Sequence, residues 1–377
     1  MNFGTSIQTE RIRDCDQTRR MLITFEQWEQ EARRLLDPRS FSYAASGAGD
    51  ESTIRANLES FQRWRIVPRI LRDVADRDLS VKLFGQTFPF PVGFAPIGRQ
   101  AMFHEQGEVA SAKAAAILGI PFIQSMVSSY SLEKVADAQP SRWFHLFFGH
   151  DRDVLKSMVL RAERAGFSAI VPTLDRPEEG WRAQNLSLCV SPFMFRYGIG
   201  NFISDPIVRQ KYGSTLTPQT MQYLTSNPHI RVEDFRFLRS ITKLPIIVKG
   251  VLHPEDANMM INYGADGLIV SNHGGRHLDG AIAALEALPS IVDVAEDRVP
   301  VMFDSGVRCG ADILKALALG AKMVFIGRPY LYGLTIAGET GVRHVIENMV
   351  ADFDLNLGMA GLKHISDLQP SILSRNS

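Results

Sequence analysis

The amino-acid sequence predicts an α/β protein, a (β/α)8 TIM barrel with an N-terminal helical segment and a long loop after the fourth strand. From about residue 90 onward, short apolar segments alternate with amphipathic helical segments, and this unit occurs eight times. A doubly wound open sheet is the structural alternative, but no Gly-x-Gly-x-x-Gly motif follows any of the strands. At four joints a glycine, which accepts the left-handed backbone that ends a helix, precedes the next strand: Gly119, Gly166, Gly264 and Gly320.

The expected strands are short runs rich in branched and aromatic residues, as in a parallel sheet that is covered on both faces. In chain order they are Pro91–Ala95, Pro121–Ser125, Phe144–Phe148, Ala169–Thr173, Ile246–Lys249, Leu268–Ser271, Val301–Asp304 and Val324–Gly327.

The segment before the barrel is predicted to be helical after a polar arm. Residues 1–24 mix charged and small polar residues without regular apolar spacing, so we interpret them as an arm whose order the sequence leaves open. From Thr24, apolar residues recur at helical spacing and Pro38 follows them, which predicts a first helix. A second helix is expected over Tyr43–Ala48 and a third from about Glu51.

One insertion interrupts the barrel rhythm. It is rich in proline, asparagine and aromatic residues, and a connection of this length is usually an active-site lid or a disordered segment. The aromatic residues favour a lid with at least partial order. The predicted division is therefore an arm (1–24) and a single barrel domain (25–377) that includes a helical preface (25–88) and a lid (183–231).

Charge and cysteine content limit the function classes. The 41 basic and 41 acidic residues balance, so no overall basic field would attract nucleic acid or anionic lipid. The three cysteines are far apart and lack metal-ligand spacing, so neither a disulfide framework nor a metal site is expected. Neither a signal peptide, a membrane span nor a peroxisomal tripeptide is recognisable, which predicts a cytoplasmic protein. The expected partner is a small molecule.

The clearest functional motif follows the sixth strand. There an apolar run ends in a polar loop that holds His273, two glycines and Arg276. Glycines let the backbone turn sharply and approach a ligand. Histidine can transfer a proton near neutral pH, and arginine can bind a carboxylate with two hydrogen bonds. A surface loop with a chance histidine is the alternative interpretation.

Other polar residues are expected at the same end of the barrel, because the carboxyl ends of all strands open at one mouth. Lys249 ends the fifth strand, where it could stabilise negative charge on a bound ring. Glycines and two arginines follow the seventh and eighth strands, where this fold often binds a phosphate. Separately each could be a solvated strand end or a helix cap, but together they indicate one binding site.

Several segments, in the same order and spacing, resemble the FMN-dependent α-hydroxy acid oxidase and dehydrogenase family, which includes glycolate oxidase, lactate oxidase and the flavin domain of flavocytochrome b2. The resemblance extends over roughly residues 24–370. Gly180-Trp181-Arg182 and the turn Pro96-Ile97-Gly98 are most similar to lactate 2-monooxygenase. The matching segments are Tyr43–Ala48, Val248–Gly250, Ser271–Arg276, Asp304–Arg308 and Ile326–Pro329.

The resemblance implies FMN as the cofactor and a 2-hydroxy carboxylate as the substrate. His273 would take a proton during oxidation, Asp175 would hold its imidazolium, and Lys249 would face the flavin N1 and O2 edge. The substrate would be bound by Tyr43, Arg182 and Arg276, beside Phe147. The implied cofactor contacts are Ile97, Gly98, Ser125, His145, Thr173, Lys249 and Ser271 around the ring, and Asp304, Gly306, Arg308, Gly327 and Arg328 around the ribityl phosphate.

The third strand departs from the family pattern at two positions. The family usually has glutamine and, two residues later, tyrosine, whereas this chain has His145 and Phe147. A histidine could still hydrogen-bond the flavin. The phenylalanine lacks a hydroxyl near the substrate hydroxyl, and one such donor is worth roughly 10²-fold or more in rate.

Three further positions suggest an altered pocket. Met126-Val127-Ser128 follows the second strand at the place where glycolate oxidase has an aromatic residue, so the pocket is expected to be wider. Gly98 resembles the glycine of the monooxygenase, which would leave room for oxygen beside the flavin. Glu178 and Glu179 are either solvated loop carboxylates or signs of a larger or partly cationic substrate.

The expected activity is FMN-dependent oxidation of a 2-hydroxy acid to the 2-oxo acid. Molecular oxygen is the expected acceptor, with release of peroxide or with decarboxylation as in a monooxygenase. The alternatives are a dehydrogenase with another acceptor, a member that acts on a larger substrate, another FMN-dependent barrel enzyme such as an isomerase, and a flavin-binding protein without turnover. The resemblance also implies a homotetramer.

Overall fold

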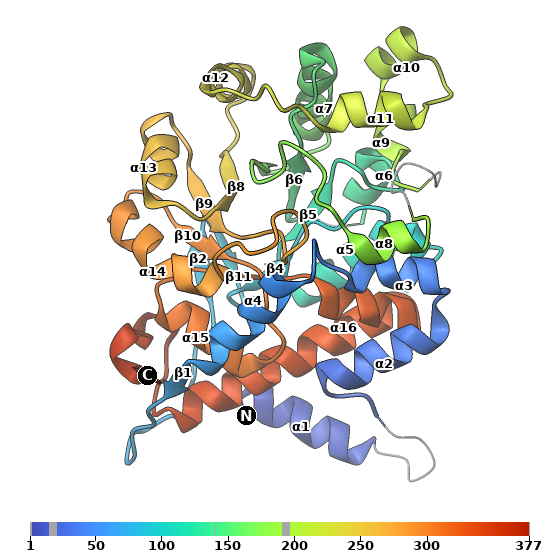
Figure 1. The fold of residues 1–377 in the computed structure, drawn as a ribbon. Coiled ribbons are helices and arrows are strands. Elements are labelled where there is room, and N and C mark those ends of the chain that lie inside the picture. The colour runs from blue at the N-terminus through green and yellow to red at the C-terminus, as the bar shows by residue number, and fades with distance from the viewer. Residues whose placement is uncertain (1, 15–20, 139, 191–196, 377) are drawn as a thin grey trace.

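Eight parallel strands form a closed barrel in the computed structural model, which describes residues 2–14, 21–138, 140–190 and 197–376 (Figure 1). The hydrogen-bonded order is β7-β6-β5-β4-β11-β10-β9-β8, and bridges between Ile170 and Ile246 and between Thr173 and Lys249 join β7 to β8. The barrel strands are β4 (Val92–Phe94), β5 (Phe122–Ser125), β6 (Arg142–Leu146), β7 (Ala169–Pro172), β8 (Ile247–Val251), β9 (Gly267–Val270), β10 (Val301–Phe303) and β11 (Val324–Ile326).

All eight predicted strands are confirmed, and the predicted TIM barrel with them. The predicted range of the third was two residues too far along, because β6 ends at Leu146. Apart from His145, every residue of the run from Trp143 to Phe148 is apolar, and the run has no glycine, proline or charged residue to mark the end of the strand. β8 continues to Val251 through an irregularity beside Gly250, whose φ is 97°.

Helices cover the outside of the barrel. The four joint glycines have positive φ values of 67°, 79°, 92° and 106°, as predicted from their position after a helix. The helices of the barrel layer are α5 (Gly107–Leu118), α6 (Leu132–Ala136), α7 (Arg152–Arg164), α12 (Val232–Ile241), α13 (Pro254–Asn262), α14 (Ala284–Ala295), α15 (Gly310–Ala318) and α16 (Arg328–Met359), the last interrupted by non-helical backbone at Ala337 and Gly338. No helix in the described ranges combines the length and apolarity needed to cross a bilayer.

The barrel interior has a core of its own, separate from the larger core between strands and helices. Side chains such as Ile123, Trp143 and Met302 fill it. A hairpin of β2 (Val81–Leu83) and β3 (Gln86–Phe88) contributes Leu83 and Phe88 to the same cluster. This apolar filling is continuous with Phe325 at the floor of the cavity described below.

The segments before the barrel add one helix to those expected and shift another. Residues 3–13, whose order the sequence leaves open, form a helix against α16, because the buried carboxylate of Asp354 accepts from the Gly4 backbone at 2.7 Å and Arg11 pairs with Glu347 at 2.6 Å. The second preface helix begins and ends earlier than expected, because Asp37 caps it. The elements before the barrel are α1 (Phe3–Arg13), α2 (Phe25–Leu35), α3 (Pro38–Ala45), α4 (Ser52–Gln62) and β1 (Trp64–Ile66). Strand β1 pairs with β12 (Leu373–Arg375), which follows the short helices η2 (Ile365–Asp367) and η3 (Pro370–Ile372) at the C-terminal end of the chain.

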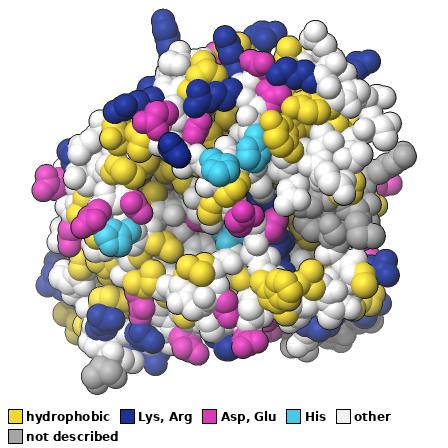
Figure 2. All heavy atoms as spheres, turned by 45° about the horizontal axis from the view of Figure 1, so that its top comes forward, with side chains coloured by type: hydrophobic (Ala, Val, Ile, Leu, Met, Phe, Trp, Pro, Cys, Tyr) yellow, Lys and Arg dark blue, Asp and Glu magenta, His cyan; other side chains and the backbone are white. Residues whose placement is uncertain are grey.

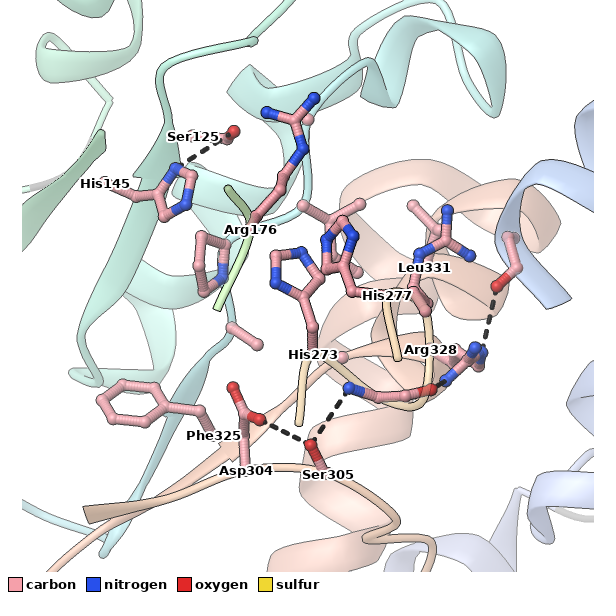
Figure 3. A pocket seen from close by; sticks show the side chains of 18 of the residues that line it. Ser125, His145, Arg176, His273, His277, Asp304, Ser305, Phe325, Arg328 and Leu331 are labelled. Carbon is pink, nitrogen blue, oxygen red and sulfur yellow. Dashed lines mark hydrogen bonds between the residues drawn. The ribbon is translucent and has the colours of Figure 1, made fainter. Parts of the chain in front are cut away.

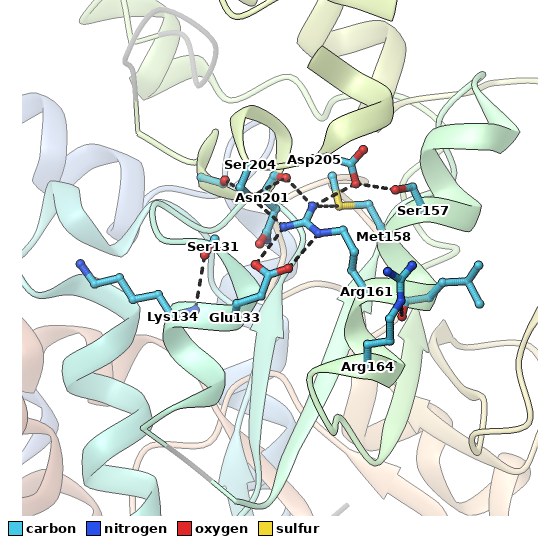
Figure 4. A network of polar contacts seen from close by, with 12 residues as sticks. Ser131, Glu133, Lys134, Ser157, Met158, Arg161, Arg164, Asn201, Ser204 and Asp205 are labelled. Carbon is cyan, nitrogen blue, oxygen red and sulfur yellow. Dashed lines mark hydrogen bonds and ion pairs between the residues drawn. The ribbon is translucent and has the colours of Figure 1, made fainter. Parts of the chain in front are cut away.

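The described part of the insertion after β7, the predicted lid, contains helices, which agrees with the partial order that its aromatic residues predict. Arg161 of α7 ties it to the barrel, because its guanidinium binds Glu133 of α6 with two bonds of 2.9 Å, Asp205 at 2.9 Å and the Asn201 carbonyl at 2.8 Å (Figure 4). Asn201 in turn donates to the Met126 carbonyl at 3.0 Å, beside the end of β5. The lid helices are α8 (Ala183–Ser187), α9 (Gly200–Ile203), α10 (Pro206–Tyr212) and α11 (Pro218–Thr225).

Candidate active site

A cavity opens at the carboxyl ends of the barrel strands. It holds about 1140 Å³ of empty space, part of it open to solvent, which suits a cofactor together with a small substrate. The face of the molecule turned forward in Figure 2 is hollowed near its middle, with histidine, acidic and apolar side chains around the hollow. The predicted site residues that line the cavity are Tyr43, Ile97, Gly98, Ser125, His145, Phe147, Arg182, Lys249, His273, Arg276, Asp304, Gly306, Arg308, Gly327 and Arg328.

Three predicted residues lie behind the cavity wall. Asp175 contacts His273, Ser271 accepts a hydrogen bond from Lys249 at 2.7 Å, and Thr173 pairs with Lys249 across the strands that close the barrel. They support residues that line the cavity, so the predicted set is brought together at one place.

His273 and Asp175 form a half-buried pair. His273 Nδ1 lies 3.0 Å from Asp175 Oδ1, and the left-handed backbone of His273 (φ 58°) is held by a bond from its N–H to Ser271 Oγ at 3.0 Å. A carboxylate only accepts hydrogen bonds, so Nδ1 carries the proton and Nε2 has a lone pair toward the cavity. Burial, followed by the charge of Lys249, keeps the pKa of His273 well below its usual value, so the imidazole is neutral and able to take a proton.

A second histidine stands against the first. The rings of His273 and His277 are edge to face, with centroids 4.2 Å apart (Figure 3). Burial, followed by the charge of His273, lowers the pKa of His277 well below its usual value. Asp175, His273 and His277 place ligand atoms within 4.8 Å of one another, a cluster that the sequence analysis did not identify. The sequence signal that could have indicated this cluster is His277, four residues after His273.

Lys249 is oriented by two partners. Its ammonium donates to Ser271 Oγ at 2.7 Å and lies 3.1 Å from Asp304 Oδ2, and both Lys249 and Asp304 are buried. Ser305 Oγ donates to the other Asp304 oxygen at 2.9 Å. The strand ends of β8, β9 and β10 therefore hold one positive charge at the centre of the cavity.

Tyr43 is surrounded by guanidinium groups. Arg99 donates to its hydroxyl at 3.1 Å, and the Arg276 guanidinium lies 5.3 Å from its ring centroid. Burial alone would raise the pKa of Tyr43, but the charges of Arg99, Arg276 and Arg182 outweigh it and bring the pKa to about 8. Tyr43, Arg182 and Arg276 thus converge as predicted, and this group suits a carboxylate.

Arg99, Arg176 and Glu179 are site residues that the sequence analysis did not assign. Arg176 lies 4.3 Å over the Phe147 ring, donates to the Thr225 carbonyl at 2.8 Å and pairs with Glu179, which also pairs with Arg182. Burial, followed by the charges of Arg182 and Arg99, lowers the pKa of Arg176 to about 9. The interpretation of Glu179 as a solvated carboxylate is wrong, because it bridges two buried arginines, whereas Glu178 is exposed.

Arg308 and Arg328 lie at the other end of the cavity. Arg328 donates to the carbonyl oxygens of Ala44 and Gly274, each at 3.0 Å. Burial, followed by the charge of Arg328, lowers the pKa of Arg308 to about 10. The buried Nε of Arg308 has no hydrogen-bond partner in the described part of the chain. Two partly buried guanidiniums, Arg308 in the loop after β10 and Arg328 at the start of α16, one of them with an unpaired donor among the described residues, make a suitable phosphate site.

The residues present fit FMN. Beyond the arginine pair, a Cβ at Gly327 would meet nothing closer than 3.9 Å, so the wall there is flat and open toward the cavity. The Thr173 hydroxyl is buried and lacks a partner among the described residues. His145, whose pKa is lowered well below its usual value by burial and then by Lys249, can hydrogen-bond a ring heteroatom in place of the family's glutamine.

The neighbourhood of Gly98 differs from the expectation. A Cβ at Gly98 would lie 2.5 Å from both the carbonyl oxygen and Cγ2 of Val127. The space that the missing side chain leaves is therefore occupied by Val127, and the glycine permits this close approach. The expected room for oxygen on that side is not present.

The sequence and the fold are similar to those of known FMN-dependent enzymes. The family model described as FMN-dependent dehydrogenase matches residues 32–375. The chain is 44% identical to an L-lactate oxidase of Lysinibacillus sphaericus, covering 94% of this chain and 93% of the relative, and 37% identical to 2-hydroxyacid oxidase 1 of Homo sapiens, covering 94% and 97%. A crystal structure of mandelate oxidase superposes with a TM-score of 0.85 at 34% identity, covering 94% of this chain and 99% of the other.

Proposed function

The chain belongs to the FMN-dependent dehydrogenase family and oxidises a 2-hydroxy acid with FMN as its cofactor, and from this premise we propose that molecular oxygen is the electron acceptor. The observation that supports the site assignment is the contact between Asp175 and His273 Nδ1, which leaves Nε2 of His273 for the substrate. His273 lines the same cavity as Arg182, Arg276 and Lys249. Relatives named as oxidases, including that of L. sphaericus, support oxygen as the acceptor.

The residues of this chain have separable tasks in that reaction. Arg182 and Arg276 bind the substrate carboxylate, and Tyr43 donates a hydrogen bond to it, which fixes the α-carbon in one orientation. His273 takes the leaving proton at Nε2, and Asp175 stabilises the imidazolium through Nδ1. When bound, FMN accepts the two electrons that leave the substrate α-carbon. Lys249 stabilises negative charge on the cofactor side.

The test is a panel of 2-hydroxy acids added to the purified holoenzyme without oxygen. We expect at least one to bleach the yellow flavin, and His273→Ala to keep the colour and lose the bleaching, with a rate at least 10²-fold lower. A panel that bleaches nothing would contradict the activity. Bleaching that survives in His273→Ala would remove His273 from the role of base.

The acceptor is tested separately. We expect oxygen consumption in step with substrate oxidation, and product analysis distinguishes a 2-oxo acid with peroxide from a decarboxylated acid. Flavin that is bleached by substrate and stays reduced in air would instead support a dehydrogenase with another acceptor.

Location and assembly remain predictions. We propose a cytoplasmic protein, in line with the balanced charge and scattered cysteines, and a homotetramer. Light scattering of the purified holoenzyme tests the assembly, and a monomer mass would contradict it.

A further inference from the structure

A carboxylate of the protein itself lies at the substrate end of the cavity. Glu179, in the loop between β7 and α8, lines the cavity together with Tyr43 and Arg276. One of its carboxylate oxygens accepts a hydrogen bond from Arg182 and the other accepts one from Arg176, and each arginine is three positions away in the chain. Arg182 is also one of the two arginines assigned to the substrate carboxylate. Glu179 therefore occupies a guanidinium that the substrate needs.

The backbone around Glu179 is held on both sides of the loop. A Cβ at Gly180 would lie 2.3 Å from the Arg276 carbonyl oxygen, so this loop packs directly on the backbone that follows β9. The Trp181 carbonyl accepts a hydrogen bond from the Gly49 N–H at 2.7 Å. Because the backbone is fixed there, an exchange of partners has to come from the Glu179 side chain, which is 25% exposed.

Arg176 gives Glu179 a partner that does not depend on Arg182. The Arg176 guanidinium lies over the face of the Phe147 ring, 4.3 Å from its centroid, and donates to the Thr225 carbonyl at 2.8 Å. These contacts fix Arg176 in place, and its side chain is 5% exposed. A Glu179 carboxylate that is displaced from Arg182 therefore remains paired with Arg176. The displacement leaves no buried charge without a partner, which would be costly.

We propose that Glu179 is an internal competitor of the substrate carboxylate, which pairs with Arg182 in the empty site and yields this guanidinium to the substrate. The inference rests on the proposed function, because it takes Arg182 as a binding group for the 2-hydroxy carboxylate. Arg176 is a positioning residue that retains Glu179 after the exchange. The apparent affinity for a carboxylate is then reduced by the fraction of molecules in which Arg182 is occupied, whereas the affinity for a neutral ligand is not.

The test is a pair of substitutions that leaves the net charge unchanged. Arg176→Met combined with Glu179→Gln removes one ion pair and leaves Arg182 without its competitor. Propionate and phenylacetate, which lack the hydroxyl group that is oxidised, are titrated into the holoenzyme by calorimetry. We expect their dissociation constants to fall about 10- to 100-fold, the range for a hydrogen bond to a charged group. Propionamide, which is neutral, should bind as it does to the wild type.

Two further variants locate the effect. Arg164→Met combined with Glu178→Gln makes the same two changes at exposed residues and should leave the dissociation constants unchanged. Adding Arg182→Met to the first double variant should abolish the gain, because the guanidinium that was made available is then absent. With a 2-hydroxy acid as substrate, the gain in kcat/KM of the first double variant should come from KM rather than from kcat, since a competitor acts on binding.

The outcomes separate this inference from the proposed function. Unchanged or weaker binding of carboxylates by the first double variant would overturn the inference, as would an equal gain for propionamide or a gain that survives Arg182→Met. None of these results affects the bleaching of the flavin by 2-hydroxy acids. If no 2-hydroxy acid bleaches the flavin, the proposed function fails, and the calorimetric comparison still decides the role of Glu179. Bound flavin shows that each variant is folded, and if the double variant lacks flavin, Glu179→Gln alone is held to the same expected fall.

Discussion

At the scale of single residues, His273 and Tyr43 need opposite protonation states. The pKa of His273 is lowered, so its neutral, proton-accepting form is present at neutral pH and is lost only as pH falls through a value below about 6.5. The pKa of Tyr43 is about 8, so its hydroxyl ionises above that pH and the phenolate repels the substrate carboxylate. Activity should therefore fall at acid pH, where His273 becomes protonated, and at alkaline pH, where Tyr43 ionises.

We therefore expect a bell-shaped dependence of kcat/KM on pH, with an alkaline limb near pH 8 that belongs to Tyr43. Tyr43→Phe should lower kcat/KM by about 10-fold, the value of one hydrogen bond to a charged group, and should remove the alkaline limb. The measurement is kcat/KM from pH 5 to 10 for both proteins. An alkaline limb that persists in Tyr43→Phe would assign it to another group.

Gly98 and Val127 form a second residue-scale test. Because a Cβ at position 98 would overlap the Val127 backbone and side chain, Gly98→Ala should lower the free energy of unfolding by about 1–3 kcal/mol, as overpacking does. Adding Val127→Ala should restore part of the lost stability, since the second substitution removes the overlap with Val127 Cγ2 but not the overlap with the carbonyl oxygen. Thermal unfolding of the single and double variants measures the coupling. Additive effects would show that the two positions are independent.

At the scale of elements, Arg161 links the lid to the barrel. Its side chain is 7% exposed and its partner Asp205 is fully buried, so Arg161→Met leaves a buried carboxylate without its cation. We expect a loss of about 3–5 kcal/mol in stability, concentrated in the lid, and faster proteolysis between α8 and α12. Because Thr225 of the lid holds Arg176, kcat/KM should fall as well.

The control for the lid experiment is again Arg164→Met, which changes the same type of side chain on the exposed face of α7. Unchanged proteolysis of the lid in Arg161→Met would show that other contacts hold it. The free energy of unfolding and the positions of proteolytic cleavage together separate a loosened lid from a global loss of stability, because a global loss would expose cleavage sites throughout the chain.

At the scale of the whole molecule, bound FMN is expected to stabilise the folded state through contacts at both ends of the cavity. A ligand that binds only the folded state stabilises it by about 2.7 kcal/mol at 100 times its dissociation constant. We expect removal of FMN to lower the midpoint of thermal unfolding, and riboflavin, which lacks the phosphate, to restore much less than FMN does. Arg308→Met should reduce the advantage of FMN over riboflavin. Equal shifts from the two flavins would contradict the assignment of the phosphate to Arg308 and Arg328.

Much of the site could be predicted because this fold converts positions in the sequence into positions in space. Lys249 lies near the carboxyl end of its strand, and Asp304 and His273 lie just beyond the ends of theirs, and parallel barrel strands end at one mouth. Their convergence therefore follows from the repeated strand and helix pattern, and their chemistry from the residue types. The same local pattern located the four glycine joints, since the left-handed backbone after a helix depends on neighbouring residues alone.

Only the tertiary structure determined the contacts between segments that are far apart in the chain. The helix at residues 3–13 has no strong local signal and is stabilised by Asp354 and Glu347, more than 300 positions away. The local sequence does not indicate that Arg176 packs over Phe147 and pairs with Glu179. Gly98 reads as a pocket opening until Val127 fills it. The sequence by itself determined the barrel and the convergence of His273, Lys249 and Asp304 at its mouth, because strand order places them. The charge and shape of the substrate end depend on which side chains meet there, and only packing in three dimensions decides that.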